Sequence, residues 1–278
     1  MTSRQRSRMS WPGSPSSSGS IRTGRYSSTA TSTPSAPGPS ERRRPRTLAG
    51  KPTLGRPLFV LNLKTYSTST GAAADRLATV LERLAGSQGV AAAVAPSMAD
   101  LGRIARTARI PVLAQHVDPI PAGAFTGQVS PASLKAAGVR GSLVNHSERP
   151  LEEAAVRSVV KELSELGLVA VVCARTVREA QRLARWRPPY LAIEPPELIG
   201  GQRAVSTARP EIVADAVRLV RRVSPHTEVL CGAGIHSPDD VRAAFELGSS
   251  GVLVASAVTR ARNPRQVLER LLSGFKAA

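Results

Sequence analysis

The most informative part of the sequence is the stretch Ala192-Ile193-Glu194-Pro195-Pro196-Glu197-Leu198-Ile199-Gly200-Gly201. A short apolar run, residues 190–193, ends at Glu194, and two prolines and two glycines follow. Pro195 has no backbone N–H and restricts the residue before it to extended geometry. We therefore expect Glu194 to stand at the carboxyl end of a strand, which is where α/β barrels place catalytic groups. A loop carboxylate on its own is more often simply solvated. The rest of the chain therefore has to show whether Glu194 is a functional residue.

Around this stretch the chain repeats one pattern eight times, an apolar run followed by a helical pattern. The runs span residues 58–62, 90–95, 111–115, 141–144, 168–173, 191–193, 228–231 and 251–255. The helical patterns span residues 71–84, 100–108, 131–137, 151–166, 176–184, 209–223, 238–247 and 264–272. Ser130 and Ser237 are candidate N-caps, and Thr176 with Glu179 has the spacing of a capping box.

The runs do not alternate with polar residues, so we expect strands buried on both faces, as in a parallel sheet. Eight such units within about 220 residues predict a closed (β/α)8 barrel, the TIM barrel fold. A doubly wound open sheet is the alternative. It usually has fewer strands and an early glycine-rich turn, and the turn at residues 63–66 contains no glycine.

Composition limits the classes of function. The chain has 278 residues, of which 41% are hydrophobic and 3% aromatic, so its core has to consist mainly of Ala, Val, Leu and Ile. A net charge of +18 first suggests a nucleic-acid partner. Residues 1–57, however, contain eleven basic residues and one acidic residue. Their net charge of 11 − 1 = +10 is more than half of the total positive excess. The remaining body is moderately basic, which suits an anionic small substrate equally well.

Residues 1–57 differ in composition from everything that follows. They are rich in Ser, Pro, Thr, Gly and Arg, which predicts a disordered basic tail before a barrel domain at residues 58–278. The basic cluster at residues 41–46 suggests contact with nucleic acid or an anionic surface, although such clusters are usually solvated. The composition also resembles an organelle transit peptide, and a third reading is that Met1 is not the true start. The sequence leaves these readings open.

The cysteines and the apolar runs point to the cytoplasm. Cys173 and Cys231 lie in apolar runs without CxxC spacing, which is typical of reduced core cysteines in a cytosolic protein. No run of 18 apolar residues occurs, and the N-terminus has no apolar signal core. We therefore expect a cytoplasmic protein that has no membrane partner.

If the barrel closes, the residues directly after its strands face one bowl. These residues are Asn62, Lys64, Gln115, His116, Asn145, His146, Glu194, Gly232, Ala233, Gly234, Ala255 and Ser256. A carboxylate can remove a proton, a neutral histidine can donate a hydrogen bond to a carbonyl, and a lysine can stabilise an enediolate or a phosphate. Glycine turns at residues 200–201 and 232–234 offer backbone N–H groups to a phosphate. The set predicts proton abstraction beside a carbonyl in a phosphorylated substrate. HxH, HExxH, Walker and GxGxxG motifs do not occur, so we expect no metal and no cofactor.

Four motifs, in order along the chain, also carry a resemblance to a known family. They are Asn62-Leu63-Lys64, Asn145-His146-Ser147-Glu148, Glu194-Pro195-Pro196-Glu197-Leu198-Ile199-Gly200 and Cys231-Gly232-Ala233-Gly234-Ile235. From about residue 58 to residue 275 the chain resembles triosephosphate isomerase, in particular its short, archaeal-type branch. Residues 1–57 have no counterpart in that family.

The resemblance implies a role for individual residues. Glu194 would be the catalytic base and His146 the electrophile, the pairing of a Glu base with a neutral His for which this family is known. Lys64 would be the third catalytic group, paired with Glu148. The substrate-binding residues would be Asn62, Lys64, Ile199, Gly234, Ala255 and Ser256.

The chain departs from the family pattern at three places. Gly201-Gln202 stands where the family usually has Thr-Gly, at the hinge of a closing loop, which bears on catalytic efficiency rather than on the chemistry. Ser97 and Ala132 replace an expected Gln and Glu.

The resemblance implies an isomerase that interconverts dihydroxyacetone phosphate and glyceraldehyde 3-phosphate through an enediol(ate), in glycolysis and gluconeogenesis. Residues 123–127 resemble a family loop that reaches into a neighbouring subunit, so we expect a homodimer or homotetramer. The alternatives are an isomerase of another phosphorylated aldose or ketose and a nucleic-acid-binding protein that uses its tail. Trp11 and Tyr26 are the only aromatic residues in the tail, which argues against base stacking and makes nucleic acid an unlikely partner.

Overall fold

The computed structural model describes residues 52–199, 201 and 204–277. Within them, eight strands form one sheet in the order β2-β1-β8-β7-β6-β5-β4-β3, and every pairing is parallel. A parallel bridge between Val94 and Val112 joins the two ends of that order and closes the barrel. The strands are β1 Leu58–Asn62, β2 Ala91–Ala95, β3 Leu113–Ala114, β4 Gly141–Val144, β5 Val169–Ala174, β6 Tyr190–Ile193, β7 Glu228–Gly232 and β8 Gly251–Val254. The predicted TIM barrel is confirmed.

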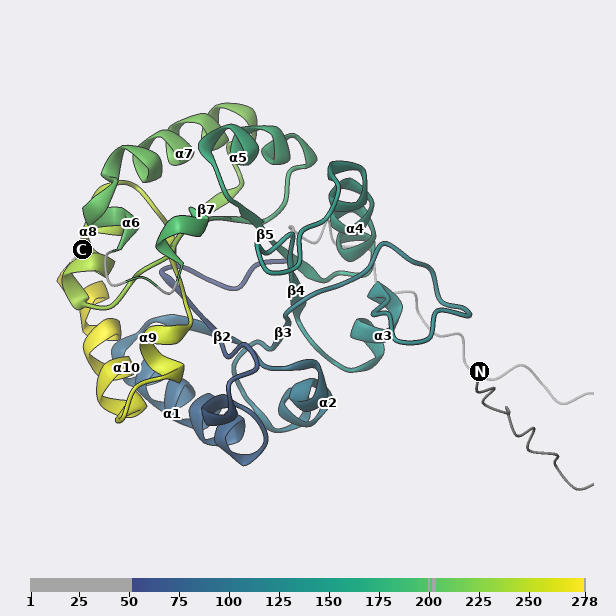
Figure 1. Cartoon of the computed structure of the whole chain (residues 1–278), viewed down its shortest axis with the longest axis horizontal. Helices are drawn as coiled ribbons and strands as arrows, with labels where there is room; N and C mark the ends of the chain where they lie inside the picture. The colour runs from purple at the N-terminus through teal and green to yellow at the C-terminus, as the bar shows by residue number, and fades with distance from the viewer. Residues whose placement is uncertain (1–51, 200, 202–203, 278) are drawn as a thin grey trace, which may run out of the picture. The chain divides into compact units, whose positions relative to one another are not determined.

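Helices surround the strands (Figure 1). They are α1 Ala72–Gln88, α2 Met98–Thr107, α3 Pro131–Ala136, α4 Glu153–Glu165, α5 Val177–Leu183, α6 Val205–Ala208, α7 Pro210–Val223, α8 Pro238–Glu246, α9 Ser256–Thr259 and α10 Pro264–Ser273. The sequence patterns did not predict α6 and α9, because a helix of four residues is too short to show a 3.6-residue period. Both lie in loops on the side of the barrel that carries the pocket described below.

Both faces of the strands are buried, and successive side chains of a strand alternate between two apolar layers. On β1, Leu58 and Val60 face the barrel interior, whereas Phe59 and Leu61 face the helices. Small and branched aliphatic side chains fill the interior, with Tyr190 as the one aromatic ring in that cluster. Because parallel strands under helices are buried on both faces, their sequences read as continuous apolar runs. The scarcity of aromatics follows from this filling of the barrel.

The segment before β1 packs against the barrel, which differs from the expected boundary at residue 57. Leu54 is buried and belongs to the interior cluster that includes Leu58 and Tyr190. Its N–H donates to the Tyr190 hydroxyl (2.9 Å), and this hydroxyl donates to the carbonyl of Gly55 (3.3 Å). One leucine among polar residues carries no periodic signal, so composition alone could not reveal this contact. The rest of the expected tail, residues 1–51, lies outside the described residues.

We predict that Leu54→Ala lowers the free energy of unfolding by about 2–5 kcal/mol, because it removes a buried side chain and leaves a cavity. Urea unfolding measures the change, with Met98→Ala as the control because Met98 is 39% exposed. A surface substitution of this kind changes stability by about 0.5 kcal/mol or less. Equal effects of the two substitutions would show that Leu54 does not belong to the core.

The expected helix caps are present, with one correction. The Ser130 and Ser237 side chains accept from the N–H groups of Ser133 and Asp240, and Ser237 with Asp240 completes a capping box. Thr176 accepts from the N–H of Glu179, but the predicted reciprocal bond is missing. The Glu179 carboxylate instead accepts from the N–H of Arg175 (2.8 Å) and from Asn145 (3.1 Å). It thus faces inward, toward the end of β4.

Candidate active site

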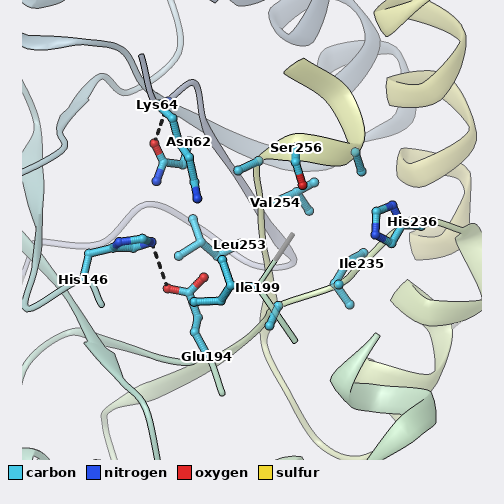
Figure 2. A pocket seen from close by; sticks show the side chains of 14 residues that line it. Asn62, Lys64, His146, Glu194, Ile199, Ile235, His236, Leu253, Val254 and Ser256 are labelled. Atoms are coloured by element: carbon cyan, nitrogen blue, oxygen red, sulfur yellow. Dashed lines mark hydrogen bonds and ion pairs between the residues drawn. The ribbon is translucent and has the colours of Figure 1, made fainter. Parts of the chain in front are cut away.

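The end of β1 presents Asn62 and Lys64 to the centre of the barrel mouth (Figure 2). Lys64 has a φ of +51°, a left-handed conformation that costs a non-glycine residue energy and often marks a functional site. Side chains hold it there: the Asn62 Oδ1 accepts from the Lys64 N–H, and the Gln115 amide donates to the Lys64 carbonyl, both at 3.0 Å. The Lys64 ammonium lies 2.5 Å from a carboxylate oxygen of Glu148. The cation is therefore fixed at both its backbone and its side chain.

The end of β4 presents His146. Its Nδ1 accepts from the backbone N–H of Glu148 at 3.2 Å. A backbone N–H can only donate, so Nδ1 carries no proton, and the proton of the neutral ring is on Nε2. The Nε2 atom lies 3.7 Å from Oε2 of Glu194. His146 is thus a buried, neutral hydrogen-bond donor directed at the same space as Glu194.

The end of β6 presents Glu194, as Pro195 predicted. The backbone N–H of Glu194 continues the ladder to the Ala174 carbonyl on β5 (2.8 Å), and the side chain is 7% exposed. Among the described residues, no group donates a hydrogen bond to its Oε2 atom. A buried acceptor without a partner costs free energy. Such a cost is typical of a group that meets its partner only when a substrate binds.

The surroundings of Glu194 make its carboxylate more basic than usual. Burial raises the pKa of Glu194, and the hydrogen bond from the neighbouring Cys173 thiol and the positive charge of Lys64 lower it by less. Cys173, on β5, is fully enclosed, so burial and the nearby Glu194 carboxylate raise the pKa of its thiol well above the ordinary value. The pair therefore consists of a neutral thiol and a desolvated carboxyl group. A carboxylate with a raised pKa is a stronger base.

We predict a pH effect on stability from this buried carboxyl. Because the folded-state pKa of Glu194 is raised, its contribution to stability is present below the unfolded-state pKa and is lost as pH rises through the folded-state pKa. Glu194→Gln cannot ionise, so the variant should gain stability relative to the wild type as pH rises above about 5. Urea unfolding of both proteins from pH 4 to pH 8 measures the difference. A difference that stays constant with pH would mean that the carboxylate is not desolvated.

The opposite wall of the pocket consists mainly of backbone. The N–H groups of Gly234, Ala255 and Ser256 donate to no acceptor among the described residues. Ser256 and Ala255 stand at the start of α9, and Gly234 follows β7. Free N–H groups at a helix start and in a glycine turn are suited to an anion such as a phosphate. This wall lies across the pocket from Glu194 and His146 (Figure 2).

One pocket contains all eight residues to which the resemblance gave a catalytic or substrate-binding role. Its lining comprises Asn62, Lys64, His146, Glu194, Ile199, Ala233, Gly234, Ile235, His236, Leu253, Val254, Ala255, Ser256 and Ala257. Gln115, His116 and Asn145, which also follow strands, do not line it. Gln115 holds the Lys64 backbone, and the His116 Nε2 lies 2.9 Å from Asp118. Gly200 and Gln202, of the expected glycine turn and loop hinge, lie outside the described residues.

Three residues shape the site in ways that the sequence analysis did not predict. Cys173 was expected to be an ordinary core cysteine; it is buried, and it neighbours Glu194. Gly232 leaves room for the base, because a Cβ atom there would lie 2.6 Å from the Glu194 Cγ. The His236 Nε2 lies 2.6 Å from the Gly201 carbonyl, and His236 lines the pocket. Contacts between distant segments produce all three roles, and local patterns do not record them.

The described residues contain no group of three or more His, Cys, Asp or Glu side chains that could hold a metal ion. The pocket instead combines a base, a neutral hydrogen-bond donor, a cation and free backbone N–H groups. Together these groups can move a proton next to a carbonyl and bind a phosphate.

Known proteins were compared with the chain. The family model for triosephosphate isomerase matches residues 57–271. Triosephosphate isomerase of Methanothermus fervidus is 46% identical over 220 residues, which cover 79% of this chain and 99% of the relative. The enzyme named triosephosphate isomerase in Methanobacterium bryantii is 45% identical over 78% of this chain and 96% of its own length. The enzyme of that name in Methanosarcina barkeri is 43% identical over 79% of this chain and 99% of its own length. The chain therefore belongs to the triosephosphate isomerase family.

Proposed function

We propose that this protein interconverts dihydroxyacetone phosphate and glyceraldehyde 3-phosphate, in glycolysis and gluconeogenesis, by transferring a proton between adjacent carbons. The proposal depends above all on the Glu194 carboxylate. It is buried, one of its oxygens has no hydrogen-bond partner among the described residues, and it lies 3.7 Å from the Nε2 of His146. Membership of a family whose relatives are named triosephosphate isomerase supports the same reaction.

In the proposed mechanism Glu194 is the base. Its carboxylate removes a proton from C1 of dihydroxyacetone phosphate, and the electron pair of the C–H bond forms a C1–C2 double bond while the carbonyl π electrons move to oxygen. His146 donates a hydrogen bond from Nε2 to that oxygen and exchanges its proton between the O1 and O2 positions. Protonated Glu194 then returns a proton to C2, and the aldehyde forms at C1. Atoms and charge balance without a cofactor.

Lys64 and Asn62 would bind and stabilise the reacting part of the substrate. The side chain of Lys64 is only 12% exposed, so little solvent screens its positive charge from a developing enediolate. Asn62, whose Oδ1 accepts from the Lys64 backbone, presents its amide to the same pocket. We propose that the substrate phosphate binds at Gly234, Ala255 and Ser256 through backbone N–H groups, with Ile199 above it.

The size of the pocket favours a small substrate. It comprises about 410 Å³ of space, part of it open to solvent at the mouth. A triose phosphate is the smallest phosphorylated sugar with the carbonyl and hydroxyl that the reaction needs.

A coupled assay on the purified full chain tests the proposed function. Dihydroxyacetone phosphate is the substrate, and a dehydrogenase specific for glyceraldehyde 3-phosphate reports the product. We expect turnover without added metal, and the same turnover after treatment with a chelator. Activity on a phosphorylated pentose, with none on dihydroxyacetone phosphate, would assign the site to a different sugar isomerase.

We further propose that the protein is a homodimer or homotetramer. Phe125 is 36% exposed at the tip of the loop at residues 123–127, where Phe125 and Gln128 close a turn by backbone hydrogen bonds. An exposed aromatic side chain on a protruding loop is typical of an interface. Sedimentation at micromolar concentration should show a species larger than the monomer, and Phe125→Asp should shift it toward the monomer. A wild-type protein that sediments only as a monomer would contradict the proposal.

Within the described residues, no helix is long and apolar enough to cross a membrane. We propose that the enzyme acts in the cytoplasm, where its triose phosphate substrates occur.

A further inference from the structure

The side chain of Asn145, the residue before His146, is held by hydrogen bonds to three different parts of the fold. Asn145 is 1% exposed and has a φ of +61°, a left-handed conformation that is uncommon for a residue with a side chain. Its Oδ1 accepts from the N–H of Leu151 at 2.9 Å, which closes the turn that carries His146. Its Nδ2 donates outward, to the Cys173 carbonyl on β5 (3.0 Å) and to Glu179 on α5 (3.1 Å).

Glu179 is the outer end of this connection. It is 7% exposed, and both of its oxygens accept hydrogen bonds: Oε1 from Asn145 and from the Arg175 guanidinium, and Oε2 from the backbone N–H and the Nε of Arg175. Burial raises the pKa of Glu179, but the hydrogen bonds from Arg175 and Asn145 lower it by more. The net pKa is therefore below the usual value, and the group is a carboxylate at neutral pH. Buried carboxylates are rare unless they are paired and hydrogen-bonded in this way.

We propose that Glu179 is a positioning residue for His146 and acts through Asn145. The inference rests on the proposed role of His146 as the hydrogen-bond donor in the reaction. Glu179 itself does not line the active-site pocket. It borders a separate cavity, lined by residues that follow β5 and β6, so its effect on the reaction has to pass through the side chain it binds.

The geometry explains why such an anchor is needed. His146 stands one residue after a left-handed backbone position, and its ring direction depends on that turn. The Glu148 N–H fixes one ring nitrogen at 3.2 Å, but Glu148 is itself on the turn and moves with it. Asn145 supplies the fixed reference, because the partners of its Nδ2 atom lie on β5 and α5 rather than on the turn. Displacement of a reacting group by about 1 Å can reduce turnover on the order of 10²-fold.

The same connection also reaches the base. The Cys173 carbonyl accepts from Asn145, and the Cys173 thiol neighbours Glu194. Asn145 thus links the strand end that carries His146 to the strand that packs against Glu194. Loss of the anchor should change the relative placement of the donor and the base, and it should leave the phosphate wall on β7 and β8 unaffected.

The test is a set of variants assayed for both kcat and KM. We expect Glu179→Ala to lower kcat by about 10- to 100-fold and to change KM by less than about threefold, because the phosphate contacts remain. Glu179→Gln still accepts from Asn145 and should recover most of the loss. Glu153→Ala is the control: Glu153 also pairs with an arginine, Arg182 of α5, at 3.3 Å, but it does not line the active-site pocket. Its kcat should equal that of the wild type.

A double-variant cycle shows whether Glu179 acts through Asn145. Asn145→Gly permits the left-handed backbone and removes only the side chain, so it keeps the protein foldable even if Glu179→Ala is not. If the two residues act in one chain, the double variant loses no more kcat than Asn145→Gly alone, within about twofold. Losses that multiply, or a Glu179→Ala variant with wild-type kcat, would overturn the proposal.

Two further measurements separate this inference from the proposed function. In the wild type, ¹⁵N chemical shifts of His146 should report a neutral ring with its proton on Nε2, and Glu179→Ala should broaden or shift these signals. His146→Gln should itself lose most of the turnover. If His146→Gln retains wild-type kcat, the proposed role of His146 is wrong; if it loses kcat while Glu179→Ala keeps both kcat and the ring signals, only the positioning role is wrong.

Discussion

Replacing Glu194 by glutamine should reduce turnover of dihydroxyacetone phosphate on the order of 10²- to 10⁴-fold, the usual cost of removing a general base. The amide keeps the size of the side chain but cannot take a proton. In free energy this corresponds to about 3–5 kcal/mol of transition-state stabilisation. Binding of a phosphorylated substrate analogue should survive, because the phosphate wall at Gly234, Ala255 and Ser256 is untouched. Steady-state kinetics and calorimetric titration with the analogue measure the two effects.

Glu197 provides the internal control for this substitution. It is three residues further along the same loop and is also next to a proline. It is exposed, however, and borders the separate cavity that Glu179 also lines, not the active-site pocket. Glu197→Gln should therefore change turnover by less than about twofold. If the two glutamines had equal effects, the loss would reflect the loop and not a base at residue 194.

Replacing Gly232 by alanine should lower kcat on the order of 10²-fold, although the new methyl group cannot take part in the chemistry. A Cβ atom at this position would lie 2.6 Å from the Cγ and 2.9 Å from the Oε1 of Glu194. Contacts this short force one of the two residues to move. Gly232 ends β7, whose backbone is fixed by the sheet, so the Glu194 side chain has to shift, and a misplaced base loses much of its rate.

The control for Gly232→Ala is an alanine substitution whose added methyl group contacts no neighbouring residue. Gly86, in the exposed part of α1, has nothing within 4 Å of its added Cβ. Gly86→Ala should keep full turnover and add about 0.5–1 kcal/mol of stability, because alanine is a better helix former than glycine. A Gly232→Ala variant with normal kcat and a normal pH profile would show that the base has more room than the structure gives it.

Local sequence patterns predicted the architecture and the position of Glu194 at the end of a strand. Pro195 placed the end of β6 at Glu194, and the absence of polar alternation indicated parallel strands covered by helices. Both signals depend only on neighbouring residues, which is why a single sequence could reveal them. The position of His146 shortly after an apolar run and a few residues before a helical pattern is a signal of the same kind.

The parts that could not be predicted depend on contacts between distant segments. Leu54 packs beside Tyr190, 136 residues away, and Asn145 meets Glu179 across 34 residues. The capping-box spacing of Thr176 and Glu179 was misleading for the same reason, because a tertiary partner competes for the carboxylate. β3 comprises only two residues, whereas the apolar run there spans five, and Val112 before it makes only an isolated bridge to Val94.

The central claim, that Glu194 moves a carbon-bound proton in this pocket, is tested most directly by isomerisation in D₂O followed by NMR. With the wild-type protein, deuterium should appear on carbon, at C1 of the recovered dihydroxyacetone phosphate and at C2 of the glyceraldehyde 3-phosphate product, because the proton on Glu194 exchanges with solvent. With Glu194→Gln the incorporation should fall in proportion to turnover. Isomerisation by the wild type with no deuterium on carbon, or unchanged incorporation by Glu194→Gln, would contradict the account.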